Sequence, residues 1–281
     1  MNKIERIKIV QKVTRDILND VIVFCEKHEI EYFMMFGTML GAVRHGGMIP
    51  WDDDIDIAMT RKNYLRFIDC VKNDGAELLK NNEIKINGSG SVKYVSEAKV
   101  GRKGTKYCLG IGADLAINSQ ITVDIFCVEY LKCSYVKNIN RNNKLRLFLV
   151  TTKLNWDEKR FLMRVFKHGN SRLKYVLISA LYLLHLLRFI FTEKGIEHII
   201  YKMAVDPTNS SKYMGIVIGN RQPSCFSSDF TLKKVPFDDL NVSIPSNYDE
   251  ILTKAYGDYM TPPPEDKRYG SDDLEIVLEI N

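Results

Sequence analysis

The feature that most constrains this chain is a short acidic run, Asp52-Asp53-Asp54-Ile55-Asp56-Ile57, in which isoleucines alternate with carboxylates as in a half-buried strand. Side chains two positions apart leave a β-strand from the same face, so Asp54 and Asp56 should present two carboxylates close together. Like charges at that distance raise each other's pKa unless a cation neutralises them. The run therefore predicts a strand whose exposed face holds a metal ion.

Carboxylate oxygens are hard ligands, so the expected ion is Mg²⁺ or Mn²⁺. Gly37-Thr38 lies shortly before the run and follows a strand-like apolar segment, 32–36. Glycine lets the backbone approach a phosphate, and N–H groups at a helix start can bind it. The alternative is a solvated acidic turn that binds Ca²⁺ weakly; the alternation argues against it, and no EF-hand loop pattern is present.

A third carboxylate is expected if two metal ions are bridged for phosphoryl transfer. Asp124 is the best candidate, because it is a single acid inside the β-branched run 121–126. Aspartate is unfavourable in a strand and hard to bury, so its position there needs a reason. Asp114 is the competitor, but it lies beside Gly112 and resembles a turn residue. We therefore expect Asp54, Asp56 and Asp124 to be the catalytic and metal-binding residues.

The order of the elements predicts an α+β protein, with a mixed β-sheet core and flanking helices. Apolar spacing predicts helices and alternation predicts strands: helices over 4–29 and 61–80, strands over 54–59, 91–95, 107–111, 121–128 and 214–218, and helical structure over 137–205. Thr60 is the expected N-cap of the second helix, and Ser246 with Asp249 has capping-box spacing for a later one. We expect three regions: a core over 1–135, a basic and apolar helical region over 136–210, and a C-terminal segment over 211–281.

The 281 residues carry a net charge of +5, which by itself does not argue for nucleic acid. The excess lies in 137–174, where eleven basic residues face two acidic ones, and an uncharged apolar run follows over 175–187. That run is shorter than the roughly 20 residues that span a bilayer. Peripheral contact with an anionic membrane fits this pattern, and so does a core helix with a solvated basic neighbour. No nucleic-acid motif accompanies the charge, so no nucleic-acid partner is expected.

The first residues have no apolar core typical of an export signal, and the six cysteines form no Cys-x-x-Cys pair. We therefore expect a cytoplasmic protein with reduced thiols, at the inner membrane face if the basic stretch docks there.

Two strings in the first quarter of the chain, 36–45 and 49–57, strongly resemble the LicD family, which includes bacterial phosphocholine transferases and is related to fukutin and fukutin-related protein. The tail agrees with the same pattern at Phe237, Ile244-Pro245, Tyr248-Asp249, 256–260 and 262–268. The resemblance covers about residues 20–130 and 230–270.

The resemblance implies a nucleotidyltransferase-like core whose Gly-Ser motif is here Gly37-Thr38 and whose Asp-x-Asp is Asp54 and Asp56, with Asp124 as the third acid. Arg44, also matched, is suited to hold a diphosphate bidentately, while His45 is at least as well explained as a structural residue. LicD-type enzymes use a CDP-alcohol donor, transfer the phospho-alcohol to a hydroxyl of a surface glycan, lipid-linked glycan or teichoic-acid-like polymer, and release CMP. The C-terminal segment is expected to complete the cleft.

Two other functions remain open on these residues. Attack on the nucleotide's own phosphate would make the protein a nucleotidyltransferase for a small molecule or sugar. Alternatively, the acids bind Ca²⁺ and the basic face binds polymer without catalysis. The transferred alcohol is also open: choline is the family default, and Trp51, Tyr256 and Tyr259 are compatible with an aromatic cage for its ammonium, but ribitol and glycerol remain alternatives.

Overall fold

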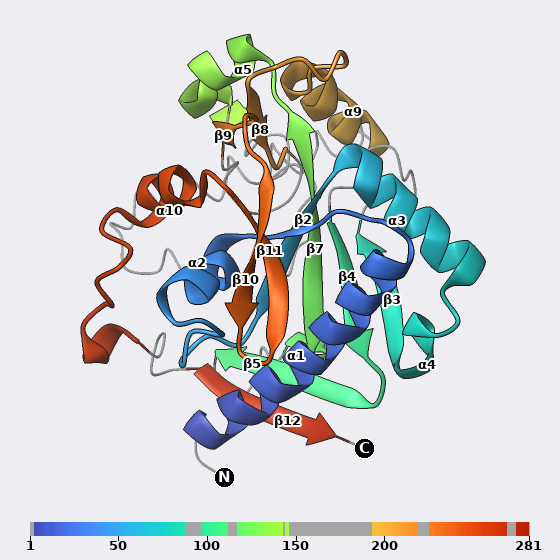
Figure 1. Cartoon of the computed structure of the whole chain (residues 1–281), viewed down its shortest axis with the longest axis vertical. Helices are drawn as coiled ribbons and strands as arrows, with labels where there is room; N and C mark the ends of the chain where they lie inside the picture. The colour runs from blue at the N-terminus through green and yellow to red at the C-terminus, as the bar shows by residue number, and fades with distance from the viewer. Residues whose placement is uncertain are drawn as a thin grey trace, which may run out of the picture.

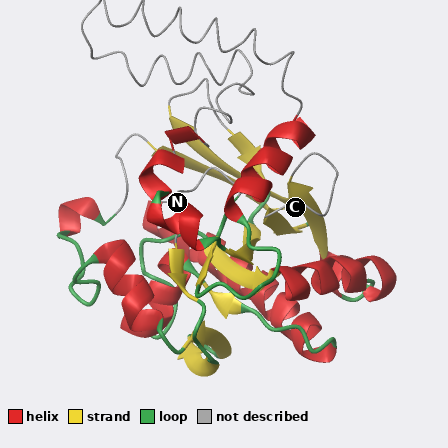
Figure 2. Ribbon diagram, turned by 90° about the horizontal axis from the view of Figure 1, so that it is seen from above, coloured by secondary structure: helices red, strands yellow, loops and turns green. Residues whose placement is uncertain are grey.

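The computed structural model describes residues 3–87, 97–111, 117–142, 144–145, 193–217, 225–268 and 274–280. The described chain is α+β: a mixed sheet lies between helices on both sides (Figures 1 and 2), as the sequence predicted. The expected strand over 91–95, the competitor Asp114, most of the basic stretch and the apolar run after it lie outside the described residues.

The main sheet positions the acidic residues. Its strand order is β1-β2-β7-β4-β3, in which β2 and β7 are parallel and the other neighbours are antiparallel. Two short strands, β8 and β9, extend the sheet from the end of β7. The bounds are β1 Phe33–Met34, β2 Ile55–Thr60, β3 Asn82–Asn87, β4 Glu97–Arg102, β7 Thr122–Tyr130, β8 Tyr213–Gly215 and β9 Cys225–Ser227.

Two helices cover one face of this sheet: α1 (Lys3–Lys27) and α3 (Arg61–Asp74). The apolar stripe of α1 is buried at 3.6-residue spacing, as Leu18 and Val21 illustrate. Thr60 caps α3, as predicted, by accepting a hydrogen bond from the Asn63 N–H. The helix is shorter than expected because Gly75, a poor helix former, follows it, and a separate turn of helix, α4 (Leu78–Asn81), completes the segment.

The other face of the sheet is covered by α2 (Phe36–Arg44), with α10 (Tyr248–Tyr256) packed against it. β2 is therefore buried on both faces, and the expectation of a half-buried strand is wrong. The sequence of β2 alternates between polar and apolar residues although the strand is buried. Its polar residue, Asp56, is covered by α2 and not by solvent. A hairpin of β10 (Leu232–Phe237) and β11 (Leu240–Pro245) packs against β1 (Figure 1).

The remaining elements form smaller units. A three-stranded sheet contains β5 (Thr105–Ile111), β6 (Ile117–Ser119) and β12 (Leu274–Ile280), and a second apolar cluster lies between α5 (Cys133–Lys137) and α9 (Glu193–Ala204). A 3₁₀ turn, η1 (Glu265–Lys267), follows the three prolines. None of the helices in the described ranges combines the length and the apolar character that crossing a membrane requires.

The predicted capping box at Ser246 is wrong. The helix begins later, at Tyr248, with Asn247 as its N-cap and no side-chain cap. Both residues of the expected pair are used elsewhere: the Ser246 hydroxyl accepts from the Thr231 N–H at 3.0 Å, and Asp249 accepts from the Tyr259 hydroxyl at 2.6 Å. Long-range contacts thus took the polar atoms that local spacing assigned to a cap.

Candidate active site

A cleft of about 560 Å³ opens where β2 begins, between α2 and the segment that follows α10. It brings together four predicted site residues, Gly37, Arg44, Asp54 and Asp56, with Asp52 beside them. The far wall comes from the C-terminal part of the chain, through Tyr256, Asp258, Tyr259, Thr261 and Pro263. The cleft is therefore acidic at the edge of the sheet and is closed by residues more than 200 positions away in sequence.

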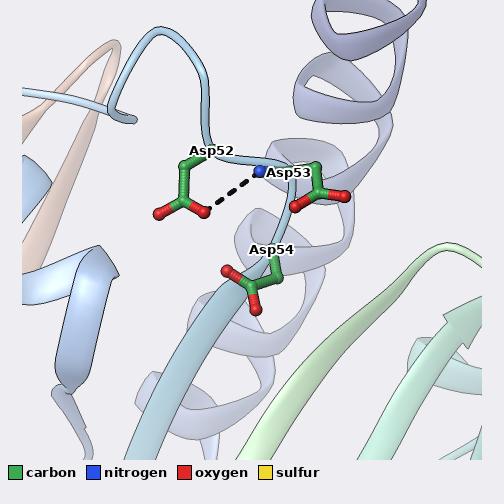
Figure 3. Close-up of side chains that lie close together, drawn as sticks. All are labelled: Asp52, Asp53 and Asp54. Atoms are coloured by element: carbon green, nitrogen blue, oxygen red, sulfur yellow. Dashed lines mark hydrogen bonds between the residues drawn. The ribbon is translucent and has the colours of Figure 1, made fainter. Parts of the chain in front are cut away.

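The acidic edge is built at the bend that leads into β2. Asp54 lies one residue before the strand and is exposed, whereas Asp56 lies inside it and is only 1% exposed. Figure 3 shows Asp52, Asp53 and Asp54 around the bend, and one carboxylate oxygen of each lies within 4.8 Å of the others. Asp52 closes the bend by accepting a hydrogen bond from the Asp53 N–H at 3.2 Å.

Asp52 is held in a tight space against α2. A Cβ on Gly37 would come within 2.7 Å of the Asp52 Oδ2, so the glycine makes room for this carboxylate. From α1, the Gln11 amide donates to the Asp52 carbonyl at 2.7 Å and fixes the bend from below. Burial, and then the charges of Asp54 and Asp53, raise the pKa of Asp52 to about 7.

Thr38 lies behind the cleft rather than in its wall. Its side chain is buried, and its hydroxyl accepts a hydrogen bond from the Asp56 N–H at 2.8 Å. This contact ties α2 to the start of β2. The Met35 N–H reinforces the same junction by donating to the Asp56 carbonyl at 3.0 Å.

Asp124 lies directly beside Asp56, because the two residues are in register on the parallel strands β2 and β7. Register partners point to the same face, and neighbouring strands are about 4.8 Å apart. Asp124 is 8% exposed. Its Oδ1 accepts from the Thr122 hydroxyl at 3.0 Å, and its Oδ2 accepts from the Lys99 ammonium at 2.5 Å. The third acid is thus next to the second, but it is not one of the described residues that line the cleft.

Positive charge gathers in the part of the cleft beside Arg44, the last residue of α2. Arg44 donates to the Tyr259 carbonyl at 2.8 Å, and the Arg268 guanidinium lies 5.2 Å from the centre of the Trp51 ring. Burial, followed by the charge of Arg268, lowers the pKa of Arg44. Burial, followed by the charges of Arg44 and Arg268, lowers the pKa of His45. This end of the cleft is suited to an anion.

Asp54 and Asp56 fit a divalent cation. They supply hard oxygen donors two positions apart at one cleft edge, and Asp56 is a nearly inaccessible carboxylate beside a second acid on the next strand. Burying such charges is expensive without a compensating cation.

Sequence reasoning missed Lys99 and its neighbour Glu97. Both lie on β4, where Lys99 is in register with Asp124, and the Glu97 carboxylate is 3.3 Å from the Lys99 ammonium. The signal was present as the alternation Glu97-Ala98-Lys99-Val100, which has the period of a strand.

Three comparisons bear on the identity of the chain. Residues 29–108, which contain the bend, α2 and β2, match the family described as LicD/FKTN/FKRP, nucleotidyltransferase domain. The lipopolysaccharide cholinephosphotransferase LicD of Haemophilus influenzae is 26% identical over 273 residues, which cover 91% of this chain and 92% of that protein. An uncharacterized protein of Rickettsia typhi is 41% identical over 51 residues, 18% of this chain and 16% of its own.

The similarity to the Haemophilus protein extends over nearly the whole length of both chains, and the family match falls on the residues that build the acidic edge of the cleft. The chain is thus similar to the LicD family over residues 29–108, and it is similar to the Haemophilus influenzae cholinephosphotransferase over nearly its whole length.

Proposed function

We propose that the chain is a phosphotransferase that moves phosphocholine from CDP-choline to a hydroxyl of a cell-surface glycan and releases CMP. The observation that carries this proposal is the composition of one cleft, which is lined by the acids Asp54 and Asp56, by Arg44 and by aromatic side chains. The relative in Haemophilus influenzae is named for cholinephosphate transfer to lipopolysaccharide, which supports both the moved group and the kind of acceptor.

The reaction is an in-line displacement at phosphorus. The acceptor oxygen forms a bond to the phosphorus that carries choline, the bond from that phosphorus to the CMP oxygen breaks, and the acceptor hydroxyl loses its proton. Such transfers depend mainly on positioning and on neutralising the charge that develops on the phosphates. A divalent ion held by Asp54 and Asp56 would supply part of that neutralisation.

The residues of the cleft have separate tasks in this proposal. Asp54 and Asp56 hold Mg²⁺ or Mn²⁺, and Thr38 fixes Asp56 through its backbone N–H. Arg44, already fixed by the Tyr259 carbonyl, presents its guanidinium to the diphosphate. Gly37 leaves the space in which Asp52 and the bend are held. Asp124, the third acid, would either complete a second metal site or accept the proton of the acceptor hydroxyl.

Choline is the proposed alcohol because the cleft offers aromatic faces. Trp51, Tyr256 and Tyr259 all line it, and a quaternary ammonium binds favourably over such rings. Ribitol and glycerol have no positive charge and would gain nothing from this wall.

The proposed glycan acceptor is linked to a lipid, so the enzyme would work at a membrane surface. The basic stretch 137–174 would bring the enzyme to a lipid-linked glycan at an anionic surface. Sedimentation with anionic vesicles should weaken as salt rises, and it should also weaken when lysines of this stretch are replaced by glutamate. Binding that ignores both changes argues against this contact.

The deciding experiment is incubation of the full chain with Mg²⁺ and CDP-choline, CDP-ribitol or CDP-glycerol, with and without glycan, followed by measurement of CMP. We expect glycan-dependent release of CMP from CDP-choline. Asp54→Asn and Asp56→Asn should each abolish it, while circular dichroism and thermal unfolding stay close to those of the wild type. Near-normal turnover in either variant would reject the assignment of the metal ligands.

The same assay separates the two other functions. A nucleotidyltransferase would release pyrophosphate from a nucleoside triphosphate rather than CMP from a CDP-alcohol. A non-catalytic protein that binds metal and polymer would take up the ion and release neither product.

A further inference from the structure

Lys99 is a cation inside the acidic face of the sheet, and neither the family match nor the proposed roles account for it. Asp56, Asp124 and Lys99 are in register on three adjacent strands, β2, β7 and β4, so their side chains leave the same face in one row. Lys99 is partly buried, with a side chain that is 33% exposed, and Asp124 is almost fully buried. The row therefore reads carboxylate, carboxylate, ammonium.

The charge of the Asp124 carboxylate is already compensated by the Lys99 ammonium. Its Oδ2 lies 2.5 Å from the Lys99 ammonium, and its Oδ1 accepts from the Thr122 hydroxyl at 3.0 Å. The Glu97 carboxylate holds the same ammonium from the other side, at 3.3 Å. Burial opposes the charged form of Lys99, but the hydrogen bonds that its ammonium donates to Asp124 and Glu97, together with the charges of both acids, raise its pKa, so the ammonium stays charged at neutral pH.

A divalent ion that used Asp124 as a ligand would have to displace this ammonium or lie against it. Like charges only a few ångströms apart repel strongly where the surroundings are partly buried. Because Lys99 neutralises Asp124, the third acid carries no uncompensated charge that would attract a second ion, and the proposed ligands that remain for a divalent ion are Asp54 and Asp56.

We propose that Lys99 supplies, at the third acid, the positive charge that a second divalent ion would supply in a two-metal centre, so that this centre takes a single divalent ion. Lys99 is thus a positioning residue, which holds Asp124 beside Asp56 and keeps its charge compensated. This role of Lys99 rests on the proposed function in one respect, that Asp54 and Asp56 are the metal ligands. It means that Asp124 does not bind a second ion.

The test is a titration of the full chain with Mn²⁺, followed by calorimetry and by the electron paramagnetic resonance signal of the free ion. We expect the wild type to take one Mn²⁺ that is lost in Asp54→Asn and retained in Asp124→Asn. Lys99→Met should take a second Mn²⁺, because Asp124 then regains an uncompensated charge. Lys99→Arg is the matched control, and it should keep one ion because it keeps the positive charge.

Two results would overturn the proposal: a wild type that binds two Mn²⁺, one of which disappears in Asp124→Asn, or a folded Lys99→Met that still binds one. The wild-type stoichiometry decides the matter even if Lys99→Met fails to fold. Failure of the proposed function would look different, because Mn²⁺ binding would then be absent from the wild type or unaffected by Asp54→Asn and Asp56→Asn.

Discussion

At the scale of single residues, the shape of the cleft depends on a glycine that leaves room for a carboxylate and on a hydrogen bond that holds the backbone of another acidic residue. Gly37 shows the first: the position where its Cβ would stand is 2.7 Å from the Asp52 Oδ2. Thr38 shows the second, because its hydroxyl accepts from the Asp56 N–H. Both residues were singled out in the sequence as phosphate-binding, yet their contacts in the structure are with the acidic edge itself.

Gly37→Ala should lower turnover while leaving the fold stable. Alanine is favoured over glycine within a helix by about 0.5–1 kcal/mol, so the free energy of unfolding should hold or rise slightly. The added methyl must push Asp52 aside, and displacement of a catalytic edge by about 1 Å can cost on the order of 100-fold in rate. Steady-state CMP release and urea unfolding measure the two effects.

A double variant checks the cause of this loss. If Gly37→Ala acts through Asp52, then Gly37→Ala combined with Asp52→Ala should be no slower than the slower single variant, because contacting residues do not add. Full additivity of the two losses would show that the glycine acts on something else, such as the backbone approach to a phosphate.

At the scale of elements, the parallel pair β2 and β7 carries the acids at one end and an ion pair at the other. Arg61, the first residue of α3, donates through Nε to the Glu129 Oε1 at 2.7 Å near the end of β7. Glu129 is 3% exposed. Burial raises its pKa, and Arg61 counteracts part of that rise. This pair joins the helix to the strand that carries Asp124.

Arg61→Met should destabilise the fold by about 3–5 kcal/mol at pH 8, since it leaves a buried carboxylate without its partner. The cost should shrink at pH 5. A raised pKa means that the folded state binds the proton more tightly than the unfolded chain, so stability from this group falls as the pH rises above its ordinary value of 4.5. Urea unfolding at both pH values measures the difference.

The matched control for this variant is Arg66→Met on the same helix. Arg66 is exposed and pairs with the exposed Glu29 at 3.8 Å, and such surface pairs contribute about 1 kcal/mol or less. An Arg61→Met cost that is equal at pH 5 and pH 8 would show that Glu129 does not titrate with folding in this range.

At the scale of the whole molecule, the cleft is closed by two distant parts of the chain. Arg44 on α2 donates to the Tyr259 carbonyl, and the Tyr259 hydroxyl donates to Asp249 on α10 at 2.6 Å. The segment after α10 is therefore tied both to the helix before it and to α2. These two hydrogen bonds hold the aromatic wall of the cleft in position.

Tyr259→Phe removes one tie and leaves the ring and the Arg44 contact in place. A hydrogen bond to a charged group contributes about 1.5–3 kcal/mol, so the segment should become more mobile. We expect KM for CDP-choline to rise several-fold while kcat changes by less than about twofold, because in the proposed function the wall would bind the donor without touching the reacting bond. A fall in kcat at unchanged KM would instead place Tyr259 in the chemical step.

The sequence by itself determined the local features: the helix over the first residues, the cap at Thr60, the acidic run and the glycine before it. These depend on short-range periodicity and on backbone preferences, which act within a few residues. Only the tertiary structure decided that Asp124 lies beside Asp56, that Lys99 neutralises it, and that Tyr259 faces Arg44. Strand register and the approach of distant segments are set by packing of the whole core, and no local pattern encodes that packing.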